Sequence, residues 1–201
     1  MAHIALPHRL AACGAVVAAA IAGCSNGVSG SAASTGGTVA TASPSWAAGL
    51  GPGVTVVPPG IAHAGDGSPG GALETVLGYL QSHAYSKVCT VLQPAQQAQC
   101  KSTLGGEPAS VVATAMPTFK HLSVSYTAIA GDKALVGLVG SICTPKQTPS
   151  CVTNSAPAAL FDSGKPFATL WARAVAARAD SYSLTPMIKI NGTWYGYTSN
   201  V

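Results

Sequence analysis

The stretch Met187-Ile188-Lys189-Ile190-Asn191-Gly192-Thr193-Trp194-Tyr195 decides how the fold ends, because apolar and polar residues alternate on both sides of Asn191-Gly192. Asn-Gly is favoured in two-residue type I′ turns, where both positions need a positive φ. The stretch therefore predicts a β-hairpin with Lys189 opposite Trp194 on one face. We expect the other face, which carries Ile188, Ile190 and Tyr195, to be buried.

Further strands are predicted upstream of this hairpin. Residues 121–128 alternate polar with apolar side chains, the pattern of a half-buried strand. Gly131-Asp132 then turns the chain into residues 133–143, which are apolar on both faces and predict a central strand. Residues 144–150 read as a loop, and the apolar spacing from Phe167 to Asp180 predicts a helix inserted before the closing strands 182–190 and 193–198.

The middle of the chain predicts helices. Apolar residues at i, i+3, i+4 and i+7 define one helix face, formed by Leu73, Val76, Leu77 and Leu80. Ser68-Pro69 supplies an N-cap and a proline at the first helical position. Similar spacing and turn residues predict shorter helices over 85–92, 95–104 and 108–116.

Helices followed by a curved antiparallel sheet that ends in the Met187–Tyr195 hairpin resemble the nuclear-transport-factor-2-like (cystatin-like) family. The resemblance covers residues 70–201 and implies an α+β cone, with N-terminal helices packed on the sheet. The helix over 167–180 departs from the simplest version of that family. A different helix-plus-sheet α+β fold therefore stays the alternative.

A separate motif lies at the start of the chain. Residues 1–23 have the basic, apolar and small-residue parts of an export signal. They end in Ile21-Ala22-Gly23-Cys24, which resembles the lipobox of bacterial lipoproteins. The resemblance implies diacylglycerol on the sulfur of Cys24, with palmitate-type chains, and cleavage after Gly23. Two acyl chains suffice for stable anchoring, so the expected location is the cell membrane, facing outside the cytoplasm. The alternative is a freely secreted protein.

Residues 24–69 predict a flexible linker. Gly, Ser, Thr, Ala and Pro supply 34 of the 45 residues from 25 to 69. Such a composition buries too little apolar surface to offset the entropy of ordering. Val54–Val57 is a short β-prone segment that Pro58-Pro59 ends, and we expect Trp46 to be an isolated linker residue.

Four cysteines remain for the exported domain: Cys89, Cys100, Cys143 and Cys151. An even number in an exported protein predicts disulfides. Pairing of sequence neighbours, 89 with 100 and 143 with 151, is the interpretation we favour, although four cysteines allow three connectivities. Zinc is the alternative, but the usual C-x2-C spacing is missing.

No catalytic constellation, cofactor motif or metal site is expected. The acidic residues of the domain do not fall at pocket positions: Glu74, Glu107, Asp132, Asp162 and Asp180. His83 and His121 are the remaining candidate bases. Four residues are candidates for lining the mouth of a cone: Tyr79, Met116, Tyr126 and Trp194. With 8% charged residues and no basic cluster, the chain has no nucleic-acid footprint.

These observations predict a non-catalytic surface module. It would be attached to the membrane through diacylglyceryl-Cys24 and would bind an envelope component, a protein or an apolar ligand. The alternative is a small hydrolase or isomerase that uses the pocket of an NTF2-like cone.

Overall fold

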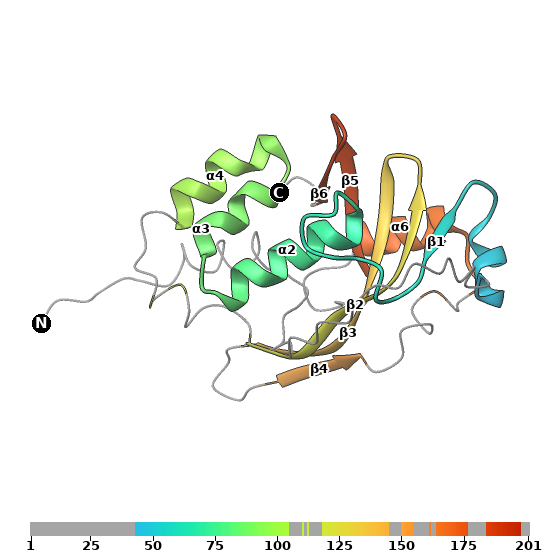
Figure 1. The fold of residues 1–201 in the computed structure, drawn as a ribbon, viewed down its shortest axis with the longest axis horizontal. Coiled ribbons are helices and arrows are strands. Elements are labelled where there is room, and N and C mark those ends of the chain that lie inside the picture. Colours follow the sequence, from blue (N-terminus) through green and yellow to red (C-terminus); the bar gives the residue numbers. More distant parts are fainter. Residues whose placement is uncertain are drawn as a thin grey trace, which may run out of the picture.

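The computed structural model describes residues 43–104, 110, 112, 118–144, 150–154, 161, 164–176 and 184–197. These residues form an α+β fold in which helices pack on an open antiparallel sheet, as the sequence predicted (Figure 1). The predicted export signal and Cys24 lie outside the described residues.

The sheet is built around one long hairpin. Strands β2 (Thr118–Ala130) and β3 (Lys133–Thr144) pair along their whole length. Strand β1 (Thr55–Val57) lies on the free side of β2, and β5 (Leu184–Ile190) with β6 (Thr193–Gly196) lies beyond β3. Strand β4 (Ser150–Asn154) pairs with residues 140–144 of β3, and β5 pairs with residues 133–137. Strand β4 begins at residue 150, the last residue of the predicted loop.

Two β-bulges shape the long hairpin. Lys120 pairs with Ser141 and Ser123 with Val139, so β2 has two residues where β3 has one. The same happens between Val124 and Thr127, where Gly137 lies opposite the extra residue. Bulges bend a strand and increase its twist. The hairpin therefore changes direction midway, and β4 and β5 occupy its two halves (Figure 1).

Glycine is required opposite the first bulge. Gly140 has φ +123°, a conformation that L residues rarely adopt, and a Cβ there would overlap the backbone of His121 and Leu122. His121 itself has φ +51° within the bulge. It therefore does not continue the regular alternation that the sequence predicted.

Helix α2 begins where its capping residues predict it. Helix α2 (Pro69–Gln81) starts at Ser68, whose Oγ accepts the N–H of Gly71 at 2.9 Å. Its predicted apolar face is buried. Three short elements follow: α3 (Tyr85–Val88), η2 (Cys89–Val91) and α4 (Pro94–Leu104). Ser110 and Val112 are helical, and most of the predicted 108–116 helix lies outside the described residues.

Helix α6 (Phe167–Ala176) lies between β4 and β5 in the chain, within the predicted range 167–180. Residues 177–180 of that range lie outside the described residues.

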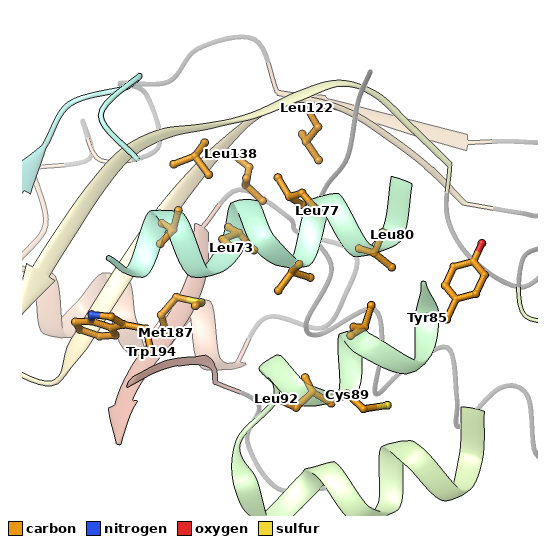
Figure 2. Close-up of a cluster of buried hydrophobic side chains, with 14 of the residues drawn as sticks. Leu73, Leu77, Leu80, Tyr85, Cys89, Leu92, Leu122, Leu138, Met187 and Trp194 are labelled. Atoms are coloured by element: carbon orange, nitrogen blue, oxygen red, sulfur yellow. The ribbon is translucent and has the colours of Figure 1, made fainter. Parts of the chain in front are cut away.

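The core has two parts, one on each face of the sheet. Ala134 and Val136 belong to a cluster under α2, and Leu135 between them belongs to a cluster that includes Phe167 and Leu170 of α6. Successive residues of a strand point to opposite faces. We call the two clusters the α2-side core and the α6-side core. Figure 2 shows the first, with Leu73 and Leu77 of α2 facing Leu122 and Leu138 of the sheet.

The prediction of a flexible linker over 24–69 is wrong for its second part. Residues Ser45–Leu50 form a short 3-10 helix, η1, and β1 pairs with β2 through Thr55–Ile129 and Val57–Thr127. Trp46 stacks on Phe161 with ring centroids 5.0 Å apart. Long-range contacts with β2 and the α6-side core therefore order a segment whose own composition does not favour order. Residues 24–42 lie outside the described residues.

The prediction that the Ile188, Ile190 and Tyr195 face of the closing hairpin is buried is also wrong. Its register is as predicted, with Lys189 opposite Trp194 and Ile188 opposite Tyr195. Trp194 and Met187 are nevertheless buried in the α2-side core, whereas Ile188, Ile190 and Tyr195 are only partly buried. Helix α2 covers the Trp194 face, and Lys189 stays exposed there with its Nζ 5.7 Å from the Trp194 ring centroid.

Candidate functional site

The two predicted disulfides are confirmed. Cys89 and Cys100 join η2 to α4, with an S–S distance of 2.04 Å, and both are buried. Cys143 and Cys151 lie directly opposite each other on β3 and β4, with S–S 2.00 Å. Cys143 is buried and Cys151 is exposed. The first bond lies inside the α2-side core, and the second is at the surface of the sheet.

The residues predicted to line a pocket do not come together. Tyr79 packs against the α2-side core. Trp194 is part of that core (Figure 2). Tyr126 packs against the α6-side core, on the opposite face of the sheet, where Trp46 meets it edge-on at 5.1 Å. Met116 lies outside the described residues. The three described side chains therefore serve packing in two separate places.

The two candidate histidines are also in separate environments. His83 follows α2 with φ +56°, and its Nδ1 lies 2.7 Å from the hydroxyl of Tyr85. His121 is exposed in the first bulge of β2. Neither is paired with a carboxylate by any hydrogen bond found among the described residues.

A different group of titratable side chains surrounds the first half of α2. Glu74 is half-buried, and its Oε1 accepts the backbone N–H of Val124 from β2 at 3.2 Å. Asp66 accepts the N–H groups of His63 at 2.8 Å and Ser68 at 2.7 Å, just before the helix begins. His63 interacts electrostatically with both carboxylates. We call His63, Asp66 and Glu74 the α2 acid–base group.

The two carboxyl groups differ in pKa. Burial raises the pKa of Glu74 above its ordinary value, although the Val124 N–H and the nearby His63 lower it in part. Slight burial also raises the pKa of Asp66, but its hydrogen bonds from Ser68 and His63 outweigh this, so the pKa of Asp66 is lowered. Glu74 therefore keeps its proton to a higher pH than Asp66.

The sequence alone does not place Glu74 at a pocket position. The partner that buries it is 50 residues away, at the point where β2 is bulged. The signal available in the sequence is a single carboxylate in an otherwise uncharged helix, Pro69–Gln81. Among the described residues no group of three or more His, Cys, Asp or Glu side chains is arranged to hold a metal ion.

Comparison with known proteins gives no relative. No family model, no curated protein and no solved structure matches the chain. Within the described residues, none of the helices has the length and apolar character needed to span a bilayer.

Proposed function

We propose that this protein is a bacterial lipoprotein, anchored in the cell membrane by diacylglyceryl-Cys24, whose extracytoplasmic domain is a non-catalytic binding module. Its partner would be an envelope component, a protein or an apolar ligand. The observation that carries the proposal is the pairing of the cysteines. The two disulfides use four of the six cysteines. Of the other two, Cys13 lies inside the leader and Cys24 ends the lipobox.

The disulfides support export to an oxidising compartment. Disulfides persist outside the cytoplasm and are rare inside it, where thiols are kept reduced. One of the two bonds crosses between paired strands at the surface, through the exposed Cys151. In a reducing compartment this bond would be accessible to cellular thiols.

We also propose the NTF2-like cone as the finer description of the domain over residues 70–201. Two features support it. The long β2–β3 hairpin is bent by two bulges, and α2 lies across the concave side of the sheet with its apolar face buried (Figure 1). The inserted helix α6 remains the departure from the simplest version of that family.

The anchor is tested by replacing Cys24 and Cys13 in turn. Cys24→Ala is expected to move the protein from the detergent phase to the aqueous phase on Triton X-114 partition and out of the membrane fraction. Cys13→Ala is the matched control and should behave like the wild type. If Cys24→Ala remains in the membrane fraction, lipidation is not what anchors the chain.

A small hydrolase or isomerase is the second candidate, and the half-buried Glu74, whose Oε1 accepts the backbone N–H of Val124, favours it. General acid–base catalysis needs a carboxyl group whose pKa is tuned toward the working pH. We expect such an activity, if present, to fall in Glu74→Gln and to survive in Asp132→Asn, an exposed carboxylate on the β2–β3 turn. A panel of chromogenic esters gives the readout. Equal rates in both variants would contradict a role for Glu74.

A further inference from the structure

The two disulfides differ in how a reagent can reach them. Cys89 and Cys100 are both buried and lie inside the α2-side core. Cys143 is also buried, but its partner Cys151 is exposed on β4. Thiol–disulfide exchange begins when a thiolate attacks one sulfur of the bond, so its rate depends on access to that sulfur. Of these four residues, only Cys151 is open to attack in the folded chain.

The sheet register places Cys151 on an open, polar face of the sheet. Two neighbouring rows cross β2, β3 and β4 there: Thr118, Cys143 and Cys151 in one, and Lys120, Ser141 and Thr153 in the next. Residues two apart on a strand point to the same face. The hydroxyls of Ser141 and Thr153 lie 2.7 Å apart on this face. Each row is exposed at both of its ends, so a thiol reagent can approach Cys151 across the face.

Lys120 favours an attack on Cys151. Its partner Ser141 is two residues before Cys143 on β3, so Lys120 is a diagonal neighbour of Cys143, a separation that a long side chain can bridge. When a thiolate attacks Cys151, Cys143 leaves as a thiolate, and a nearby cation stabilises that leaving group. The described carboxylates lie elsewhere, in the turn before β3 or around α2: Asp132, Asp66 and Glu74. The other carboxylates of the domain lie outside the described residues: Glu107, Asp162 and Asp180.

Strand β4 has few other attachments to the sheet. It has five residues, and in the described part of the chain it pairs with β3 alone, through residues 140–144. Two side-chain hydrogen bonds add to this ladder: Thr153 bonds to Ser141, and the Nδ2 of Asn154 donates to the carbonyl of Leu138. The disulfide joins residues 8 apart and so removes entropy from the state in which β4 is detached. Reduction therefore weakens the attachment of β4.

We propose that Cys143–Cys151 is an exchangeable disulfide through which a dithiol reductant outside the cytoplasm, of the Cys-x-x-Cys type, controls the attachment of β4. The first thiolate of the reductant attacks the sulfur of Cys151, the disulfide breaks, and Cys143 leaves as a thiolate. The second thiolate attacks the reductant's own sulfur in the mixed disulfide, and Cys151 leaves. The two thiol protons of the reductant end on Cys143 and Cys151, and the reductant ends as a disulfide. The inference rests on export of the domain, which the proposed function includes, but not on lipidation of Cys24.

Selective reduction of the oxidised full chain tests the exchange, and because it uses purified protein its outcome is independent of the anchor. The chain is treated with dithiothreitol without denaturant, quenched with iodoacetamide and mapped by mass spectrometry. We expect Cys143 and Cys151 to become alkylated more than about a hundredfold faster than Cys89 and Cys100, which a reagent reaches only when the α2-side core opens. Equal rates for the two disulfides would overturn the proposal.

Trapping of the mixed disulfide tests which sulfur is attacked. The probe is a thioredoxin whose second active-site cysteine is replaced by serine, so that the mixed disulfide cannot be resolved. We expect it to be linked to Cys151. A link to Cys143, or no link under conditions in which dithiothreitol reduces the bond, would overturn the proposed route.

A matched pair of variants tests Lys120. Lys120→Gln should slow reduction of the Cys143–Cys151 bond by about two- to threefold, through the poorer leaving group. The difference should vanish at about 1 M salt, where the Debye length is about 3 Å. Lys133→Gln removes the same charge at the other end of β3 and should leave the rate unchanged. Equal rates for the two variants would overturn the role of Lys120.

Hydrogen exchange tests the release of β4. After selective reduction and alkylation, the amides of Ser150–Asn154 should exchange about fiftyfold faster, which is the loop-closure contribution of a bond between residues 8 apart. The amides of 133–137, which pair with β5, are the internal control and should not change. Cys143→Ala/Cys151→Ala lacks the bond without adding alkyl groups and should show the same increase. Unchanged exchange over 150–154 in this double variant would overturn the control of β4, whatever the alkylated chain shows.

Discussion

Replacement of Trp46 by alanine tests whether the segment before β1 belongs to the folded domain. The indole stacks on Phe161 at 5.0 Å and meets Tyr126 edge-on at 5.1 Å. Trp→Ala at a fully buried site costs about 3–5 kcal/mol. Each aromatic pair contributes about 0.5–1.5 kcal/mol beyond the area that it buries. Because Trp46 is half-buried, we expect Trp46→Ala to lower the free energy of unfolding by about 2–3 kcal/mol.

The assay is urea unfolding followed by far-UV circular dichroism, which does not depend on the deleted indole. Trp46→Phe keeps an aromatic ring on Phe161 and should lose less than half as much stability as Trp46→Ala. Ile61→Ala, in the same segment but 55% exposed, is the matched control and should change stability by less than about 0.5 kcal/mol. A Trp46→Ala protein as stable as the Ile61→Ala control would refute the packing of η1 on the α6-side core.

Three further changes test the α2 acid–base group, its helix cap and the bend of the hairpin. Because burial raises the pKa of Glu74 in the folded state, its contribution to stability is fully present below the ordinary glutamic acid pKa and is lost as pH rises through the folded pKa. The melting temperature of Glu74→Gln should therefore decline less steeply than that of the wild type above pH 4.5. An unchanged decline would contradict the raised pKa of Glu74. Ser68→Ala removes the N-cap of α2 and should cost about 1 kcal/mol in urea unfolding, a loss that Ser68→Asp should largely avoid. Gly140→Ala forces a Cβ into the backbone of His121 and should lower the free energy of unfolding by more than about 2 kcal/mol. Gly78→Ala, in open space on α2, is the control and should raise stability by up to about 1 kcal/mol. Equal melting temperatures for the two variants would argue against the bulge.

Local signals were enough to predict most of the elements. The Ser68-Pro69 cap fixes the start of α2, and the apolar stripe of three leucines and one valine fixes its buried face. Asn191-Gly192 fixes the register of β5 and β6, with φ +49° and +85° at the two turn positions. Of the three possible connectivities, the favoured pairing of sequence neighbours is the one present, with separations of 11 and 8 residues.

The parts that the sequence did not predict depend on distant partners. Val54–Val57 becomes β1 only because the free edge of β2, about 70 residues later, supplies its hydrogen bonds. Trp194 is buried in place of Ile188 because α2 packs on that face, and the hairpin sequence does not encode which face a helix will cover. Burial against the sheet raises the pKa of Glu74, and the hydrogen bond from the Val124 N–H, 50 residues away, lowers it in part. Each of these depends on tertiary contacts that periodicity does not encode.

The most direct test of the lipoprotein proposal is mass spectrometry of the N-terminal peptide of the protein purified from its own membrane. The proposal predicts a peptide that begins at Cys24, with the mass of a diacylglyceryl group on its sulfur. A peptide that begins at or near residue 24 with an unmodified cysteine, or one that still carries residues 1–23, would contradict the proposal.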